Sequence, residues 1–223
     1  MQTVSGKKIL AIYGSGGAGT ELYEMISVSS LINDWQEIVF IDDTKPQGII
    51  HNIKSYPFCD FVSAYKVEET EIVIAVGNPS SRELLYKKVK DAGYTFGKVI
   101  SETALVSPSA IVDDGVVVLD RTIVSSGAHI GTNTFINGTA IVGHNVDVGA
   151  NCLICSFSMI AGHARIGNNS FIGASSCVRD EIVLGSNVVV SMGAVVLKNV
   201  KDGMIVMGNP AREISKSNAN VFG

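Results

Sequence analysis

Charged side chains are scarce in the second half of this chain. Residues 104–199 contain only ten Asp, Glu, Lys and Arg residues of both signs, and the whole chain of 223 residues has a formal net charge of −4. The sequence has no basic stripe to neutralise nucleic-acid phosphates and no Lys- and Arg-rich amphipathic segment to bind acidic lipid headgroups. The composition therefore argues against a nucleic-acid-binding protein and against a protein of the membrane surface.

Long hydrophobic runs are also missing. The sequence never approaches the roughly 18 consecutive apolar residues of a membrane-spanning helix. The apolar run at residues 7–13 is too short for a signal peptide and is followed by no cleavage site. We therefore expect a cytoplasmic protein, and its 46% of hydrophobic residues is enough to form a folded core.

Cysteine is sparse, and its placement does not suggest a metal site. Among the four cysteines, Cys152 and Cys155 form a C-x-x-C pair that could indicate a redox or zinc motif. The sequence has no second pair and no His, Cys and Asp cluster with ligand spacing, so we expect no metal. We interpret both thiols as small apolar filler. No Cys or Ser is paired with a base in the sequence, which argues against a covalent intermediate.

A six-residue repeat dominates residues 106–196. Every sixth residue from Val106 to Val196 is Val, Ile or Leu, sixteen times without an insertion, and fifteen of the sixteen are β-branched. β-branched residues favour strands, and a six-residue period is typical of a parallel β-helix. Glycines such as Gly131 and Gly143 follow these positions and suit tight corners. At three hexads per coil, the repeat predicts about five coils.

The first hundred residues have a different pattern, in which apolar strands alternate with helices. This alternation predicts a small parallel α/β sheet. The expected strands are residues 7–13, 37–41 and 71–76, the expected helices follow residue 19 and cover about 80–93, and a short strand at 97–100 leads into the repeat. We therefore expect three parts: an α/β half-Rossmann domain at 1–102, a β-helix at 103–199 and a C-terminal cap at 200–223.

A glycine-rich turn, Gly14-x-Gly16-x-x-Gly19, lies between the first strand and the first helix. Glycine leaves room for phosphates, and a helix N-terminus favours an anion. Asp42 and Asp43, at the end of the second strand, are placed to bind a ribose hydroxyl. About one hundred residues are too few for the usual dinucleotide-binding domain, so a nucleotide-sugar fits better. A purely structural turn remains an alternative.

Four histidines are candidates for a general base. We expect His51 to face solvent, and the outward ring of His129 has no obvious role. His144 and His163 both lie near corners of the repeat, nineteen residues apart, which is about one coil plus one residue. Neither the spacing nor the composition decides between these two.

Together, the motifs resemble a known family. Their order is GSGGAG, then DD, then AVGN, then NGTAIVGH within the hexads, and finally GNPAR. This order resembles the left-handed β-helix sugar acyltransferases, which include the N-acetyltransferase of bacillosamine biosynthesis, perosamine N-acetyltransferase and sialic acid O-acetyltransferase. The resemblance extends from about residue 7 to residue 212.

The resemblance implies a left-handed β-helix, against the usual right-handed crossover. It also implies a homotrimer with active sites between neighbouring β-helices, a nucleotide-linked amino sugar held by the α/β domain, and acetyl-CoA bound along the β-helix. The implied sugar-nucleotide residues are Gly16, Gly17, Ala18, Asp42, Asp43 and Gly77. The implied coenzyme residues are Leu153, Ala174 and Met192, with His163 as a further coenzyme or packing contact and the Gly162 amide at the thioester carbonyl.

By the same resemblance His144 is the general base, but the residue after it departs from the family. Several members have a carboxylate where this chain has Asn145, and an amide can orient an imidazole without stabilising its charged form. Three possibilities follow: His144 acts as a weaker base, another acid such as Asp147 assists it, or a backbone carbonyl orients it. We expect Asn137 and Thr139, upstream in the same turn region, to hold the sugar.

The predicted function is acetyl-CoA-dependent N-acetylation of a nucleotide-linked 4-amino-4,6-dideoxy sugar, for surface-glycan or glycoprotein sugar biosynthesis, by direct transfer in a ternary complex. Alternatives are O-acetylation of a sugar hydroxyl, as in sialic acid, a trimer that binds nucleotide-sugars without catalysis, and a dinucleotide-dependent enzyme.

Overall fold

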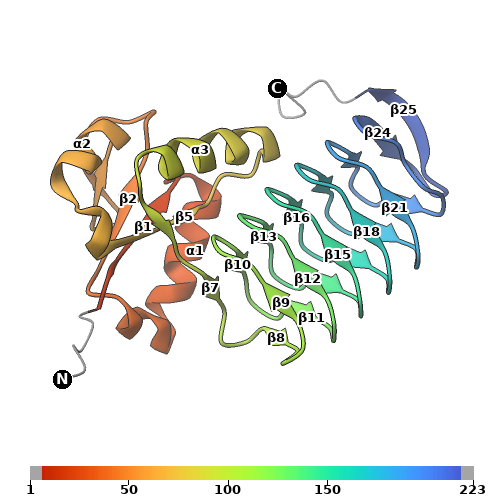
Figure 1. Ribbon diagram of the computed structural model, residues 1–223, viewed down its shortest axis with the longest axis horizontal. Coiled ribbons are helices and arrows are strands. Elements are labelled where there is room, and N and C mark those ends of the chain that lie inside the picture. Colours follow the sequence, from red (N-terminus) through yellow and green to blue (C-terminus); the bar gives the residue numbers. More distant parts are fainter. Residues whose placement is uncertain (1–6, 217–223) are drawn as a thin grey trace. The chain divides into compact units, whose positions relative to one another are not determined.

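The computed structural model describes residues 7–216, and these residues cluster into two units (Figure 1). The α/β unit comprises the described residues up to Val76 together with Leu85–Gly97. The β-helix unit comprises Gly77–Leu84 and the chain from Lys98 onward. The outermost parts of the expected domains, residues 1–6 and 217–223, lie outside the described residues. No described helix has the length and apolar character needed to traverse a lipid bilayer.

The α/β unit is built on a six-stranded sheet of order β3-β4-β2-β1-β5-β6. All neighbouring strands are parallel except β3 and β4. Its strands are β1 (Ile9–Tyr13), β2 (Glu37–Ile41), β3 (Gly48–Ile50), β4 (Ile53–Tyr56), β5 (Thr70–Ile74) and β6 (Thr95–Phe96). The three expected strands are the three central ones. β3, β4 and β6 were not predicted, because each has four residues or fewer and no long apolar run.

Three helices accompany this sheet in sequence. They are α1 (Gly17–Ser27), α2 (Phe58–Ala64) and α3 (Pro79–Asp91), with 3₁₀ turns at Ser30–Asp34 and Val67–Glu69. α1 buries Leu22, Met25 and Ile26, the 3–4 residue spacing of one helix face. It packs tightly against the preceding turn, since a Cβ at Gly19 would lie 1.8 Å from the Gly14 carbonyl oxygen. α2 was not predicted, and the first six residues of α3 belong to the β-helix unit.

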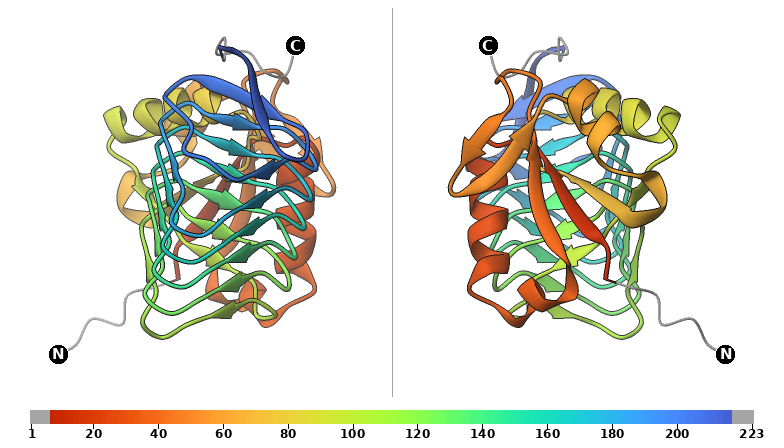
Figure 2. Two further views of the ribbon diagram at one scale, coloured as in Figure 1. Left: turned by 90° about the vertical axis from the view of Figure 1, so that its right-hand side faces the viewer. Right: turned by 90° about the vertical axis from the view of Figure 1, so that its left-hand side faces the viewer.

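The β-helix unit consists of stacked coils, and each of the first five contributes one two-residue strand to each of three faces, on which the stacked strands run parallel (Figure 2). The first face has β7 (Val99–Ile100), β10 (Val117–Val118), β13 (Phe135–Ile136), β16 (Leu153–Ile154), β19 (Phe171–Ile172) and β22 (Val189–Val190), and is extended by β24 (Met204–Met207) and β25 (Arg212–Lys216). The second face has β8 (Leu105–Val106), β11 (Ile123–Val124), β14 (Ile141–Val142), β17 (Met159–Ile160), β20 (Cys177–Val178) and β23 (Val195–Val196). The third face has β9 (Ile111–Val112), β12 (His129–Ile130), β15 (Asp147–Val148), β18 (Arg165–Ile166) and β21 (Val183–Leu184).

The aliphatic residues of the hexads form the core of this coil. Fourteen of the sixteen are at most 3% exposed, and only Val106 and Val112, in the first coil, are half-buried. Each buried side chain of this size stabilises the fold by about 1.5–3 kcal/mol. Residues two positions earlier, most of them smaller, fill the remaining space, and Cys152 is one of them, with no exposed surface. This placement agrees with the interpretation of Cys152 as filler.

The corners between faces share one backbone conformation. Every sixth residue from Gly115 to Gly193 has a positive φ, the left-handed region that glycine and asparagine tolerate best. The first corner, between the first and second faces, has Arg121, Thr139, Phe157, Ser175 and Gly193 at this position. The second corner, between the second and third faces, has Gly127, Asn145, His163 and Glu181. The third corner, between the third and first faces, has Gly115, Asn133, Asn151, Asn169 and Asn187.

Candidate active site

Both candidate bases lie at the second corner, on successive coils. The ring centroids of His144 and His163 are 4.9 Å apart with the rings edge to face. The His163 amide donates to the His144 carbonyl at 3.0 Å, so the backbone holds the two residues in register. His144, Asn145 and His163 are all exposed. The corner therefore offers two imidazoles to a solvent-borne reactant.

Gly162 lies directly against the His144 ring. A Cβ at this position would be 2.6 Å from both Cε1 and Nε2 of His144, so any side chain would displace the imidazole. The Gly162 N–H donates no hydrogen bond to any residue within the described range 7–216. A proton acceptor and an unused amide donor thus lie side by side, as stabilisation of an oxyanion next to a general base requires.

Asn145 is the side chain in contact with the other nitrogen of His144. Its Nδ2 lies 3.3 Å from His144 Nδ1. For Nε2 to accept a proton, Nδ1 must carry the ring hydrogen and an oxygen must face it. Rotation of the Asn145 amide about its last torsion supplies that oxygen, so Asn145 can set the required tautomer.

Asp147, the expected alternative assistant, is engaged elsewhere. Its carboxylate lies 3.1 Å from Nδ1 of His129, on the outward side of the third face. Nε2 of His129 is 3.1 Å from Asp113. The sequence showed no obvious role for the His129 ring, and the structure gives it one, because the ring bridges two carboxylates of neighbouring coils. His51, expected to face solvent, is exposed, and its Nε2 lies 3.2 Å from the Thr20 hydroxyl.

Asn137 and Thr139 do not share a turn with His144. They lie at the first corner, and strand β14 separates them from the second corner, so this part of the expectation is wrong. Ala174 and Met192 are at the first corner as well, stacked one coil apart, and Met192 is 77% exposed. Four of the residues expected to bind the sugar or the coenzyme therefore lie at the first corner, where the second-face strands begin. The two histidines lie at the second corner, where these strands end.

Gly77 and Leu153 are neighbours within the β-helix unit. A Cβ at Gly77 would lie 3.7 Å from Leu153 Cδ2. Leu153 points outward from the first face but is only 7% exposed. The structure thus brings together one residue expected to bind the sugar nucleotide and one expected to bind the coenzyme.

In the α/β unit, Asp42 secures the glycine-rich turn. Its carboxylate accepts hydrogen bonds from the Ser15 amide at 3.2 Å, the Ser15 hydroxyl, and the Thr44 amide at 3.0 Å and hydroxyl at 2.6 Å. Burial alone would raise the pKa of Asp42, but these hydrogen bonds outweigh it and lower the pKa to about 2. The sequence contained no signal for the role of Ser15, because only the fold brings it to Asp42.

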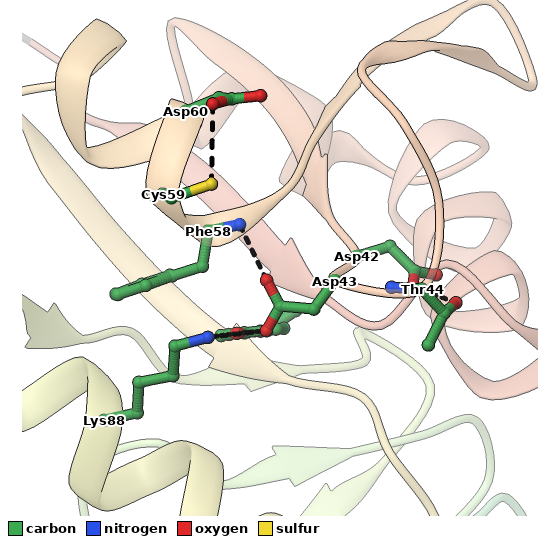
Figure 3. Close-up of polar contacts among 8 residues, drawn as sticks. Asp42, Asp43, Thr44, Phe58, Cys59, Asp60 and Lys88 are labelled. Carbon is green, nitrogen blue, oxygen red and sulfur yellow. Dashed lines mark hydrogen bonds and ion pairs between the residues drawn. The ribbon is translucent and has the colours of Figure 1, made fainter.

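Asp43 is held by three donors, of which Figure 3 labels Phe58 and Lys88. Its carboxylate accepts from the Phe58 amide at 2.8 Å, Lys88 Nζ at 2.6 Å and the Tyr13 hydroxyl at 2.5 Å. Burial opposes ionisation, but the bonds from Lys88 and Tyr13 prevail and lower the pKa of Asp43. Burial, and next the Asp43 hydrogen bond, raise the pKa of Tyr13. Asp43 therefore braces the end of β2 rather than presenting a free carboxylate.

The glycines at the start of α1 leave open space. A Cβ at Gly16 or Gly17 would meet no atom within 4 Å, and Ala18 follows in the first turn of α1. The positive end of the α1 dipole and this uncovered backbone suit an anionic group. The three residues expected near the phosphates therefore share one accessible turn.

The described residues provide no metal site and no activated thiol. No group of three or more His, Cys, Asp and Glu side chains between residues 7 and 216 is placed to hold a metal ion. Burial raises the pKa of Cys152 and of Cys155 to about 11. Both thiols are therefore protonated at neutral pH and are poor nucleophiles.

Comparison with known proteins matches both halves of the chain. Residues 9–89 match the family model of the PglD N-terminal domain, and residues 163–198 match the hexapeptide repeat of succinyl-transferase. The acetyltransferase domain of PglB from Neisseria gonorrhoeae FA1090 is 31% identical, with a TM-score of 0.87 over 93% of this chain and 100% of that one. The same domain is known in complex with acetyl coenzyme A.

Two more distant proteins share the fold. A perosamine N-acetyltransferase variant from Caulobacter crescentus, in complex with CoA and GDP-perosamine, is 23% identical, with a TM-score of 0.85 over 93% of this chain and 97% of that one. WeeI from Acinetobacter baumannii AYE is 24% identical, with a TM-score of 0.84 over 93% of this chain and 100% of that one. The expected α/β half-Rossmann and left-handed β-helix fold is confirmed. The chain belongs to the family of left-handed β-helix sugar N-acyltransferases with a PglD-type N-terminal domain, and it is an acyltransferase.

Proposed function

We propose that this acyltransferase moves the acetyl group of acetyl-CoA to the amine of a nucleotide-linked 4-amino-4,6-dideoxy sugar. The observation that carries the proposal is the His144 ring lying against Gly162, whose N–H donates to no other described residue. The acetyl-CoA complex of the PglB domain supports the donor. The complex of perosamine N-acetyltransferase with CoA and GDP-perosamine supports the class of acceptor.

The chemistry follows from these two groups. The sugar amine attacks the thioester carbonyl while His144 Nε2 takes its proton. The Gly162 N–H donates to the oxyanion of the tetrahedral intermediate. The C–S bond then breaks, and the coenzyme thiolate takes this proton from the imidazolium and leaves as the thiol. Asn145 orients the ring, and His163 contacts the coenzyme or supports His144 by packing.

The α/β unit supplies the nucleotide end of the acceptor site. Gly16, Gly17 and Ala18 bind the diphosphate or sugar through the open turn at the start of α1. Asp42 acts mainly by shaping that turn, and Asp43 by bracing the end of β2, because protein donors already satisfy their carboxylates. Gly77, which belongs to the β-helix unit and lies next to Leu153, completes the set.

The enzyme works as a homotrimer. The outward residues of the second face are all apolar, whereas the third face carries His129, Asp147 and Arg165. The second-face residues are Leu105, Ile123, Ile141, Met159, Cys177 and Val195, of which Leu105 is 68% and Met159 41% exposed. An apolar strip of this kind suits burial against another copy. A trimer also brings the first corner of one subunit, with Asn137, Thr139, Ala174 and Met192, to the histidines of the next. A monomer in sedimentation at micromolar concentration would contradict this.

Substrate panels test the function directly. We expect UDP, TDP or GDP, with and without coenzyme A, to raise the thermal unfolding temperature, since a ligand at a hundredfold excess over its Kd stabilises by about 2.7 kcal/mol. Transfer to amine but not hydroxyl acceptors is the expected result with acetyl-CoA. Transfer only to hydroxyls would make it a sugar O-acetyltransferase, and nucleotide binding without any transfer would reject the proposed acceptor.

A further inference from the structure

A fully buried arginine lies at the junction of α3 and the third corner. Arg82 has no exposed surface. Its Nε donates to the Asn133 backbone carbonyl at 3.0 Å, and its Nη2 donates to the same carbonyl and to Asn133 Oδ1 at 3.0 Å. The Asn133 side chain donates back to the Arg82 carbonyl at 3.2 Å. The guanidinium carbon also lies 5.5 Å from the centre of the Phe135 ring.

A ladder of asparagine side chains continues this contact along the third corner. Asn133 Nδ2 donates to Asn151 Oδ1 at 2.8 Å, and Asn151 Nδ2 donates to Asn169 Oδ1 at 3.0 Å. Asn169 Nδ2 then donates to Glu83 Oε2 at 3.0 Å. The ladder of asparagine side chains therefore contacts α3 at two adjacent residues, Arg82 and Glu83.

Burying the charged guanidinium of Arg82 costs free energy, which indicates a specific role for this residue. Burial lowers the pKa of Arg82 to about 9, so the side chain is still charged at neutral pH. Burying a charge is expensive unless hydrogen bonds compensate it. An apolar side chain would fill the same space without that cost, but it could not fork onto two oxygens of one corner residue.

Hydrogen bonds connect Arg82 to the residues at the start of α3. The Arg82 amide donates to the Asn78 carbonyl at 2.9 Å, and Asn78 Oδ1 caps the Ser81 amide at 3.1 Å. Asn78 follows Gly77, which lies against Leu153. A displacement of Arg82 would therefore move Gly77 relative to the first face.

We propose that Arg82 is a positioning residue that fixes the Gly77–Leu84 segment to the β-helix, so that the acceptor-binding residue Gly77 keeps one distance from the coenzyme-binding residue Leu153. The proposal rests on the proposed function for the roles of Gly77 and Leu153. Arg82 itself touches neither substrate. It determines how the acceptor approaches the thioester, and its loss weakens acceptor use rather than coenzyme binding.

Asn133→Gly is the decisive variant, and Asn187→Gly is its matched control. Both positions have the same left-handed φ at the third corner, where Gly115 occurs naturally, but only Asn133 contacts Arg82. Hydrogen exchange of the amides of residues 79–84 measures the anchoring, and steady-state kinetics measure its effect. Loss of hydrogen bonds to a charged group predicts about ten- to a hundredfold faster exchange in Asn133→Gly. We expect KM for the nucleotide-sugar to rise while KM for acetyl-CoA is unchanged, and no change in Asn187→Gly.

Two further variants separate positioning from packing. Arg82→Lys keeps the charge but cannot fork, so an intermediate effect is expected, whereas Arg82→Met keeps the bulk and should behave like Asn133→Gly. The proposal is overturned if Arg82→Met behaves as wild type, if both glycine variants exchange alike, or if both KM values rise equally. Failure of the proposed function would appear separately, as a wild-type enzyme that acetylates no nucleotide-linked amino sugar. The exchange difference would still decide whether Arg82 fixes the segment.

Discussion

The second and third corners of the β-helix have the same backbone conformation, but their polar side chains differ in exposure and hydrogen bonding. At the third corner the asparagine amides bond to one another, and Asn133 and Asn151 are buried. At the second corner His144, Asn145 and His163 are exposed, and the Gly162 N–H donates to no other residue of the described range. Stacked left-handed corners therefore form a scaffold where their polar groups satisfy one another, and a reactive surface where they do not.

Removing the base at the second corner should have the largest effect. We expect His144→Ala to lower kcat by about 10² to 10⁴, the usual range for loss of a general base, while calorimetry still detects coenzyme binding. His163→Ala is the matched control on the next coil and should act less, chiefly through KM. A His144→Ala enzyme with near-normal kcat at saturating substrate would reassign the base.

Filling the space next to the imidazole should be the next largest effect. In Gly162→Ala the new methyl group would lie about 2.6 Å from the His144 ring, which must move away. Misplacement of a reacting group by about 1 Å can cost up to about a hundredfold in rate, and kcat should fall accordingly. In a His144→Ala background the methyl group has room, so the second substitution should add little. Full additivity of the two effects on kcat would show that Gly162 does not act through His144.

Charging the neighbour of the base should shift a pH profile rather than abolish activity. Asn145→Asp places a carboxylate beside His144, and an opposite charge favours the protonated imidazole. Because the enzyme needs the neutral form, the acidic limb of the kcat/KM profile should move to higher pH. Asn187→Asp, at an exposed position of the third corner outside the hydrogen-bonded ladder, should leave that limb in place. An unchanged profile in Asn145→Asp would mean that residue 145 does not govern the ionisation of the base.

A substitution at the first corner should have the smallest effect, and that effect should be on stability. Phe157 has a φ of 60° and is 68% exposed, so it has a strained backbone and little burial within one chain. Asparagine tolerates this conformation, and Phe157→Asn should raise the free energy of unfolding by up to about 1 kcal/mol in urea titrations. Ser175→Asn, one coil further on, should gain less. Destabilisation of Phe157→Asn would show that the ring, at the corner that the proposed trimer brings to a neighbouring subunit, gains more from that contact than the left-handed backbone costs.

Much of the fold could be predicted from sequence, because the six-residue period repeats the same local choice sixteen times. The three central strands of the α/β sheet were also predictable from their apolar runs. β3, β4 and α2 were missed because short elements with mixed polarity have no periodic signal. The asparagine ladder did leave one, since Asn133, Asn151, Asn169 and Asn187 recur every 18 residues. Arg82, its partner, left none.

The sequence alone determined the β-helix, the position of its corners and the set of candidate bases, since all of these depend on local spacing and residue type. Only the tertiary structure decided that His144 lies against Gly162 and His163, that Asp147 serves His129 instead, and that Asn137 and Thr139 lie at another corner. The physical reason is the stacking of residues 18 apart. This stacking brings each side chain against the next coil. Such a contact depends on the register of the coils and on side-chain direction, and the sequence of a single hexad specifies neither.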